Sequence, residues 1–264
     1  MTSGGKASKQ SSDVAIDCRG VGLTPGIGID ILDDITLSVR EGEFVAIVGP
    51  SGCGKTTFLN AVAGLSVHTR GTLVVRGRAP AAGRRDTSYV LARDTLLPWR
   101  TAVENVELPL MLRGVSKLER RKLAEDALSS VGLNSALERH PVALSQGMRQ
   151  RVALARAFVT KPTLMMMDEP FGALDAQTRM LMQDLLLSLL EEFGGTLLFI
   201  THDLAEALVL ADRVVLFSNR PARVRAEYVV DIPRPRSSED VRHDSRFVDL
   251  HDEMWRALKD ELEP

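Results

Sequence analysis

A glycine-rich segment, residues 49–57, has the residue types and spacing of a phosphate-binding loop. One glycine, four further residues and then Gly-Lys-Thr stand between a strand-like apolar run and a helix-like segment, the order that such a loop requires. Backbone N–H groups can then cradle the phosphates, and the Thr56 hydroxyl can bind Mg²⁺. Lys55 can neutralise the β- and γ-phosphate oxygens, which makes it a candidate catalytic group. A plain glycine turn with an exposed lysine is the alternative. The candidate nucleotide-binding residues of this segment are Gly49, Pro50, Ser51, Gly52, Cys53, Gly54, Lys55, Thr56 and Thr57.

Two carboxylates follow a second apolar run, residues 164–167. Asp168 is placed to coordinate Mg²⁺, directly or through water. Glu169 is placed to hold and polarise an attacking water molecule, which predicts it as the general base. His202 follows the apolar run 197–200 at a carboxyl strand end, where ligand sites of α/β sheets form, so we predict that it contacts a terminal phosphate. The alternatives are a capped Asp-Glu-Pro turn and a purely structural histidine.

A second segment, residues 144–151 with the sequence LSQGMRQR, reads as another helix start. Ser145 has the residue type of an N-cap, and Gly147 allows close backbone approach. Helix starts favour anions, so Ser145, Gln146 and Gly147 are further candidate nucleotide ligands. Two such starts in one chain predict that two surfaces converge on one polyphosphate. Asp175, in an Ala-Leu-Asp sequence, is placed to reach across a subunit boundary.

The residues after 164 alternate between apolar strand-like runs and helical segments, which predicts an α/β fold with a mostly parallel sheet. Residues 14–48 contain short strand-like runs broken by glycine-rich turns, and the last of them leads into the phosphate loop. The alternating elements are expected at residues 164–167, 177–193, 196–201, 204–210 and 214–217.

The remaining segments are interpreted from their composition and residue pattern. Residues 98–160 are helical and charged, which indicates an inserted helical lobe, and residues 1–12 read as a disordered tail. Residues 232–236 read as an extended linker before a final amphipathic helix, so 231–264 is a separate tail. After a cap at Ser116, the apolar residues expected on one helix face are Leu118, Leu123, Ala127, Leu128 and Val131. The corresponding stripe of the last helix is Phe247, Leu250, Met254, Leu258 and Leu262.

The composition limits the function classes. The 264 residues are 44% hydrophobic, which is enough for a substantial core, and a net charge of −2 disfavours nucleic acid as a partner. Cys18 is isolated and Cys53 lies in the glycine loop, so neither a disulfide framework nor a metal-ligand spacing exists, and a reducing cytosol fits best. The apolar clusters are too short for a bilayer, so a membrane role must be peripheral.

With these motifs in this order, the chain resembles the ATP-binding cassette (ABC) ATPases over residues 14–230. The resemblance implies a P-loop NTPase domain at 13–230 with an antiparallel β subdomain and an inserted α-helical subdomain, and ATP and Mg²⁺ as ligands. In that family two nucleotide domains dimerise head to tail, and each ATP lies between one phosphate loop and the signature helix of the other domain. Carried over, Ser145 and Gly147 would contact the γ-phosphate bound by the opposite subunit, and His202 would sense the γ-phosphate.

Finer features are similar to the nitrate, taurine and sulfonate importer branch. Residues 96–101 and 104–106 resemble the loop beside the membrane-subunit groove, and residues 233–236 with Trp255 resemble the tail of that branch. This implies a peripheral ATPase at the cytoplasmic face of the inner membrane, paired with a second ATPase subunit or copy, with permease subunits and indirectly with a solute-binding protein. Core packing of residues 96–99 and simple docking of the tail helix are alternatives.

Two other readings of function remain. A soluble cassette protein could act as a conformational switch without a membrane partner, although the Leu-Leu-Pro-Trp loop argues against it. A P-loop kinase or GTPase would leave residues 144–151 unexplained.

The chain departs from the family pattern at three positions. Ala92 stands where a glutamine usually contacts Mg²⁺ and the attacking water, so Arg93, Asp94 or a water must substitute, and we expect altered coupling rather than loss of hydrolysis. Gln146 stands where glycine is commoner, and can bond across the dimer or face solvent. Residues 19–28 lack the aromatic that stacks on adenine in relatives, so Leu23 or Pro25 is expected to pack there instead, with weaker base binding.

Overall fold

A six-stranded sheet forms the centre of the molecule, with the strand order β5-β6-β7-β3-β8-β9. Five strands are parallel and the edge strand β9 is antiparallel to β8, which confirms the expected mostly parallel α/β fold. The computed structural model describes residues 13–26, 28–92 and 95–262, so the predicted tail at 1–12 lies outside the described residues. The strands are β5 (Thr87–Val90), β6 (Leu164–Asp168), β7 (Thr196–Ile200), β3 (Phe44–Val48), β8 (Arg213–Phe217) and β9 (Val224–Val229).

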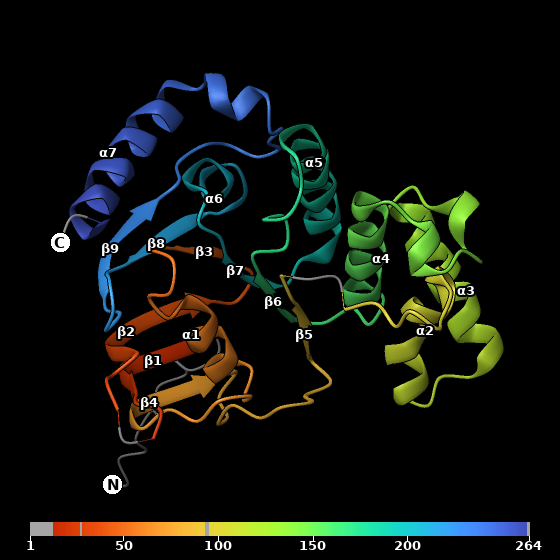
Figure 1. Cartoon of the computed structure of the whole chain (residues 1–264), viewed down its shortest axis with the longest axis horizontal. Coiled ribbons are helices and arrows are strands. Elements are labelled where there is room, and N and C mark those ends of the chain that lie inside the picture. The colour runs from red at the N-terminus through yellow and green to blue at the C-terminus, as the bar shows by residue number, and fades with distance from the viewer. Residues whose placement is uncertain (1–12, 27, 93–94, 263–264) are drawn as a thin grey trace, which may run out of the picture.

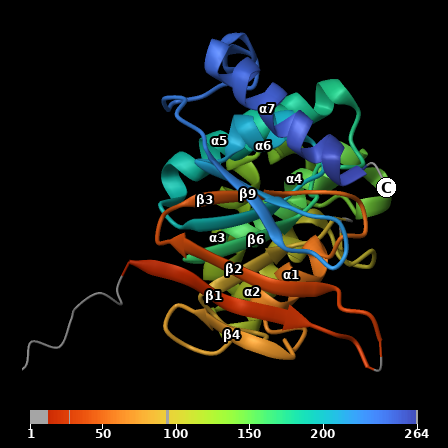
Figure 2. The same ribbon diagram turned by 90° about the vertical axis from the view of Figure 1, so that its left-hand side faces the viewer.

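The two faces of this sheet carry different layers (Figure 1, Figure 2). One face packs on α1 (Lys55–Val62) and on a three-stranded antiparallel sheet, and the other on three helices. Side chains of β3 alternate between the two cores, with Val45 and Ile47 on the first side and Ala46 on the second, so every residue of β3 is buried. The antiparallel sheet is β2 (Leu32–Arg40), β1 (Val14–Leu23) and β4 (Arg70–Val75), and the helices are α5 (Ala176–Phe193), α6 (Leu204–Leu210) and α7 (Ser245–Leu262).

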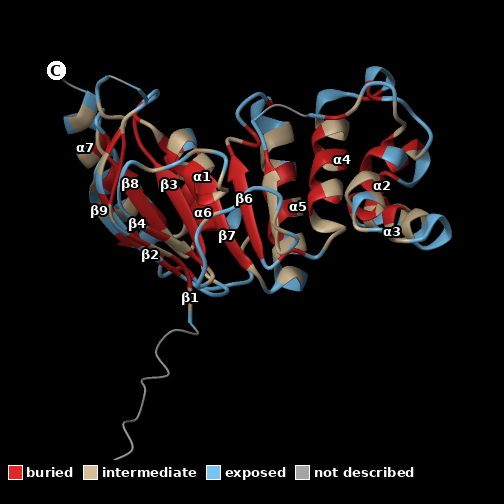
Figure 3. Ribbon diagram, turned by 90° about the horizontal axis from the view of Figure 1, so that it is seen from below, coloured by how far each residue is buried: buried red, intermediate tan, exposed pale blue. Residues whose placement is uncertain are grey.

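Three further helices form the predicted helical subdomain beside β5 and β6, with a buried core of its own (Figure 1, Figure 3). Ser116 caps the middle helix as expected, because it accepts a hydrogen bond from the Glu119 N–H. The expected apolar face is partly wrong, since Leu118 is 86% exposed while Ala124 is fully buried. These helices are α2 (Ala102–Leu112), α3 (Lys117–Ser130) and α4 (Gln146–Phe158), with short 3-10 turns at Asn134–Ala136 and Pro141–Ala143.

The C-terminal helix α7 docks on the domain through part of its predicted stripe. Phe247, Met254 and Leu258 are buried against the core that also contains α6, whereas Leu262 is 54% exposed. Another 3-10 turn, Asp240–His243, precedes it. Among the described residues, none of the helices has the length and apolar content needed to cross a bilayer.

The predicted linker at 232–236 is fastened to the domain by a half-buried arginine, Arg236. Arg236 donates hydrogen bonds to the carbonyl oxygens of Ala211 at 2.6 Å, Val230 at 3.1 Å and Ile232 at 2.7 Å. Burial, followed by the nearby Arg234 charge, lowers the pKa of the Arg236 guanidinium to about 10, so it remains a cation at neutral pH. The segment therefore sets the position of α7 instead of leaving it loosely tethered.

Replacing Arg236 with Ala should lower the free energy of unfolding by about 3 kcal/mol, because three carbonyl oxygens in buried residues lose their donor. Urea denaturation followed by circular dichroism measures the change. Arg256→Ala, at an exposed position of α7, is the matched control and should stay within about 0.5 kcal/mol of the parent. Equal stabilities of the two variants would contradict the anchoring role.

Candidate functional site

The glycine-rich loop lies between β3 and α1 and encloses a cavity of about 220 Å³. Two glycines are required by close contacts: a Cβ on Gly49 would lie 2.7 Å from the Phe217 carbonyl oxygen, and one on Gly54, at φ 123°, would lie 2.8 Å from Ile31 Cγ2. Larger residues would therefore displace the loop. The loop residues that line the cavity are Ser51, Gly52, Gly54, Lys55, Thr56 and Thr57.

Lys55 lies over this loop rather than in solvent. It is 5% exposed, and its Nζ donates to the carbonyl oxygens of Gly49 at 2.8 Å and Pro50 at 2.9 Å. The ammonium group thus faces the cavity, where it can neutralise phosphate oxygens. Cys53 is fully buried, its backbone N–H bonds to the Pro50 carbonyl, and burial raises the pKa of its thiol, so its side chain is a packing group beneath the loop.

Two oxygen donors from different elements meet beside the loop. The Thr56 hydroxyl donates to Asp168 Oδ1 at 3.1 Å. Thr56 belongs to α1, which follows β3, whereas Asp168 is the last residue of β6, two strands away from β3 in the sheet. Burial raises the pKa of the Asp168 carboxyl, and the hydrogen bond from Thr56 opposes this shift. Within the described ranges no three His, Cys, Asp or Glu side chains form a metal cluster. Two hard oxygen donors beside a polyphosphate cavity fit Mg²⁺, which takes few protein ligands and completes its shell with phosphate and water oxygens.

Glu169 and His202 form a pair at the edge of the cavity. Glu169 lines it and has the left-handed backbone value φ 44°, which is strained for a residue with a side chain. His202 Nδ1 lies 3.1 Å from Glu169 Oε2, and both side chains remain partly exposed. A carboxylate held in this way can bind and polarise a water molecule at the cavity edge.

The second predicted helix start does not reach this cavity within the chain. Ser145 caps α4 by accepting from the Met148 N–H at 3.3 Å, and neither Ser145, Gln146 nor Gly147 lines the cavity. Figure 1 places α4 well apart from α1, on the far side of β6 and α5. Ser145 and Gln146 are exposed, so the positive end of α4 is open to an anion presented by another molecule.

Asp175 also lies outside the cavity, and an arginine connects its loop to Asp203, the residue after His202. Asp175 caps α5 by accepting from the Thr178 N–H at 3.0 Å. Arg179 bonds to the Leu174 carbonyl at 3.1 Å and to the Asp203 carboxylate at 3.0 Å, next to His202. The sequence patterns did not identify Arg179, although its position one helical turn after Asp175 could have suggested a role at the same surface.

Two more residues of the cavity wall, Ile31 and Arg220, were not predicted. The expectation that Leu23 or Pro25 replaces the missing aromatic is wrong for Leu23, which is 6% exposed in the core beneath. Pro25 is exposed and is not among the cavity residues described. Arg220 could have been found, because it follows the carboxyl end of β8, the same kind of position as that of His202.

Ala92 follows β5 and is exposed, whereas Arg93 and Asp94, its predicted substitutes, lie outside the described residues. Altered coupling at this position therefore stays a prediction.

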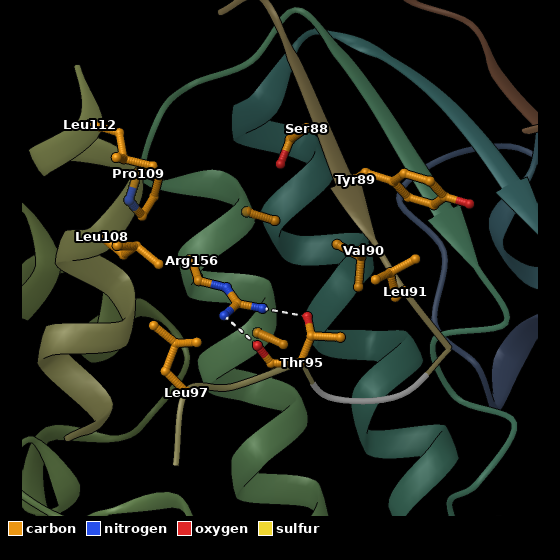
Figure 4. Close-up of a pocket in the computed structure, with 12 residues that line it drawn as sticks. Ser88, Tyr89, Val90, Leu91, Thr95, Leu97, Leu108, Pro109, Leu112 and Arg156 are labelled. Carbon is orange, nitrogen blue, oxygen red and sulfur yellow. Dashed lines mark hydrogen bonds between the residues drawn. The ribbon is translucent and has the colours of Figure 1, made fainter. Parts of the chain in front are cut away.

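A groove of about 320 Å³ lies between β5, α2 and α4 (Figure 4). Arg156 crosses it and donates to the Thr95 carbonyl and hydroxyl oxygens, both at 2.9 Å. The buried Asn105 holds its adjoining loop, because it bonds to the backbone of residues 97, 100 and 101. Of the predicted loop, Leu96 packs in the core, Leu97 lines the groove and Trp99 is 71% exposed. The groove thus offers apolar side chains next to the charged Arg156 and the polar Thr95.

Known proteins match both the sequence and the fold. An ABC transporter ATP-binding protein of Methanocaldococcus jannaschii is 40% identical over 90% of this chain and 87% of its own length. The nitrate import ATP-binding protein NrtC of Synechococcus elongatus is 41% identical over 89% of this chain, which corresponds to 36% of that longer protein. The bicarbonate transport ATP-binding protein CmpC of the same species is 42% identical over 84% of this chain and 34% of its own length.

A solved ATP-binding cassette shows the same fold as a dimer. It is in a post-hydrolysis state with ADP and Pi, and it matches with a TM-score of 0.73 and 33% identity over 83% of this chain and 100% of its own. The family model described as ABC transporter matches residues 32–172. The chain therefore belongs to the ABC transporter family, as one of its ATP-hydrolysing cassettes.

Proposed function

We propose that this cassette energises an importer for a small anion or a small organic solute of the nitrate, sulfonate or taurine kind. The observation that carries the proposal is a partly apolar groove between β5, α2 and α4 in a chain that also has an intact phosphate site, since the groove offers a membrane subunit a place to act on the cassette (Figure 4). Relatives named for nitrate and bicarbonate transport support the anion class. The solute itself would be recognised by other chains.

In this proposal the residues of the cavity divide the chemistry between them. Lys55 and the loop N–H groups hold the terminal phosphates, and Thr56 with Asp168 would hold Mg²⁺, which neutralises the charge of the phosphates when bound. Glu169 accepts a proton from the attacking water, and His202, 3.1 Å from Glu169, orients that carboxylate and senses the γ-phosphate.

A second cassette would complete the site. The capped start of α4 and Asp175 are exposed and lie away from the cavity, so in a head-to-tail dimer they can face the nucleotide of the opposite subunit. The dimeric cassette structure among the relatives supports this arrangement. We place Ser145, Gln146, Gly147 and Asp175 at that shared boundary.

The membrane partner would contact the groove between β5, α2 and α4. Leu112 and Leu91, which line it, are 74% and 40% exposed, and the exposed Trp99 lies on the adjoining loop. An apolar helix of a permease subunit could bury these side chains, which would place the cassette peripherally at the cytoplasmic face of the inner membrane. A solute-binding protein would act only through that permease.

The function is tested by purifying the chain together with any membrane protein that binds to it, and then reconstituting the two proteins in vesicles. We expect ATP hydrolysis to rise several-fold when a nitrate-, sulfonate- or taurine-loaded binding protein is added. Leu112→Asp should abolish recovery of the membrane protein, whereas Leu118→Asp, at an even more exposed position on α3, should not. A chain that hydrolyses ATP without any membrane partner would instead support the soluble switch.

Replacing Glu169 with Gln should lower ATP turnover at least about 100-fold, because the amide cannot accept the proton of the attacking water. ATP binding should persist, so the variant should accumulate as an ATP-bound dimer, measured by light scattering after size-exclusion chromatography. Ser145→Arg in the same background should return it to the monomer by blocking the start of α4. A Glu169→Gln chain that stays monomeric with ATP would contradict the shared site.

Replacing Asp168 with Asn should raise the melting temperature of the nucleotide-free chain at pH 8 and remove the further stabilisation by Mg²⁺ and ATP. Burial raises the pKa of the Asp168 carboxyl in the folded chain above its unfolded value, so the protonated carboxyl favours folding. This stabilisation is fully present below the unfolded pKa and is lost as the pH rises through the folded pKa. The gain should therefore shrink as the pH is lowered toward 5. Asp126→Asn, at an exposed position, is the control, and a lower melting temperature for Asp168→Asn at pH 8 would refute the prediction.

A further inference from the structure

Arg220 stands on the opposite side of the phosphate loop from the proposed catalytic groups. In the strand order, β7 and β6 follow β3 on one side, and they carry His202 and Glu169 at their carboxyl ends. β8 follows β3 on the other side, and Arg220 comes three residues after it. Glu169 and Arg220 both line the cavity of the loop, so a nucleotide whose terminal phosphate lies toward Glu169 can place its nucleoside end beside Arg220.

The Arg220 side chain is held in place by main-chain oxygens. Its Nε donates to the Asp30 carbonyl and its Nη2 to the Ile29 carbonyl, both at 3.3 Å. The two segments are also joined by hydrogen bonds from the Ala222 N–H to the Ile31 carbonyl and from the Asp33 N–H to the Ala222 carbonyl, each 2.9 Å. These contacts use two of the five N–H donors of a guanidinium and leave its faces uncovered by them.

Asp30 and Asp33, on the segment that Arg220 contacts, have their carboxylates engaged by other arginines. Arg70 pairs with Asp30 at 2.6 Å and with Asp33 at 3.0 Å, and Arg223 pairs with Asp33. Arg220 therefore brings a cation to the cavity wall, where Ile31 supplies an adjacent apolar surface. A planar, weakly hydrated cation beside an aliphatic side chain suits the face of an aromatic ring.

We propose that Arg220 and Ile31 form the base-binding wall of this cassette, with the Arg220 guanidinium stacked on the adenine. Residues 19–26 and 28–31 contain no Phe, Tyr or Trp that could provide the stacking surface instead. The proposal rests on the proposed nucleotide site, because it needs a polyphosphate held by Lys55 and the loop. It adds a specificity-determining residue at the nucleoside end of that site.

The test is titration calorimetry of the full chain with Mg-ATP, Mg-ADP, Mg-CTP and inorganic tripolyphosphate. Arg220→Ala should weaken the binding of ATP and ADP by roughly two- to thirtyfold and leave the affinity for tripolyphosphate unchanged. The ratio of the affinities for ATP and for CTP, whose base has a smaller ring, should fall. Arg220→Lys should not restore affinity, whereas Arg220→Trp should restore it in part. Arg223→Ala, which removes a neighbouring arginine bound to Asp33, is the matched control and should bind all four ligands like the parent.

Three other results would each contradict base stacking by Arg220. Equal losses of ATP and tripolyphosphate affinity in Arg220→Ala, with rescue by Lys, would show a phosphate contact and overturn base stacking. Unchanged ATP affinity in a folded Arg220→Ala chain would also overturn it, while the nucleotide site itself would stand. A parent chain that binds neither ATP nor tripolyphosphate would instead refute the proposed nucleotide site, and the base wall with it.

Discussion

The hydrogen bond between Thr56 and Asp168 depends on the register of three parallel strands. β7 separates β3 from β6, so the bond forms only when β7 is paired correctly with both neighbours. A slip of β6 by one residue would turn Asp168 to the other face of the sheet. The same register sets the places of Glu169 and His202, so the sheet and the site are specified together.

The site also lowers the stability of the protein that contains it. The Asp168 carboxyl is buried, the Lys55 ammonium donates to carbonyl oxygens of its own loop, and Glu169 has a left-handed backbone. Each of these features costs folding free energy, which a phosphate and a metal ion bound at the loop would offset. The large buried sheet on both sides supplies the stability that makes such a site tolerable.

The fold and the motif positions were predictable because their signals are local. The phosphate loop needs its glycines within a few residues, and buried parallel strands such as β6 are continuous apolar runs. Arg236 and Ile31 were not predictable in this way, because their roles come from contacts with segments remote in sequence. The position of Arg220 after a strand end was visible in the sequence, but its contacts with residues 29 and 30 were not. Leu118 was misplaced because α3 has a weak apolar periodicity, and only packing decides which face is buried.

The continuity of α5 has a mechanical consequence. Its first turn is capped by Asp175, at the proposed dimer boundary, and one face further along binds the C-terminal segment, because Asp184 accepts from the Ser238 N–H at 2.7 Å and hydroxyl at 3.0 Å. The helix runs unbroken between these points. A helix with an intact hydrogen-bond ladder is stiff, so α5 is a rigid connection between the docking site of the C-terminal segment and the surface proposed for a second cassette.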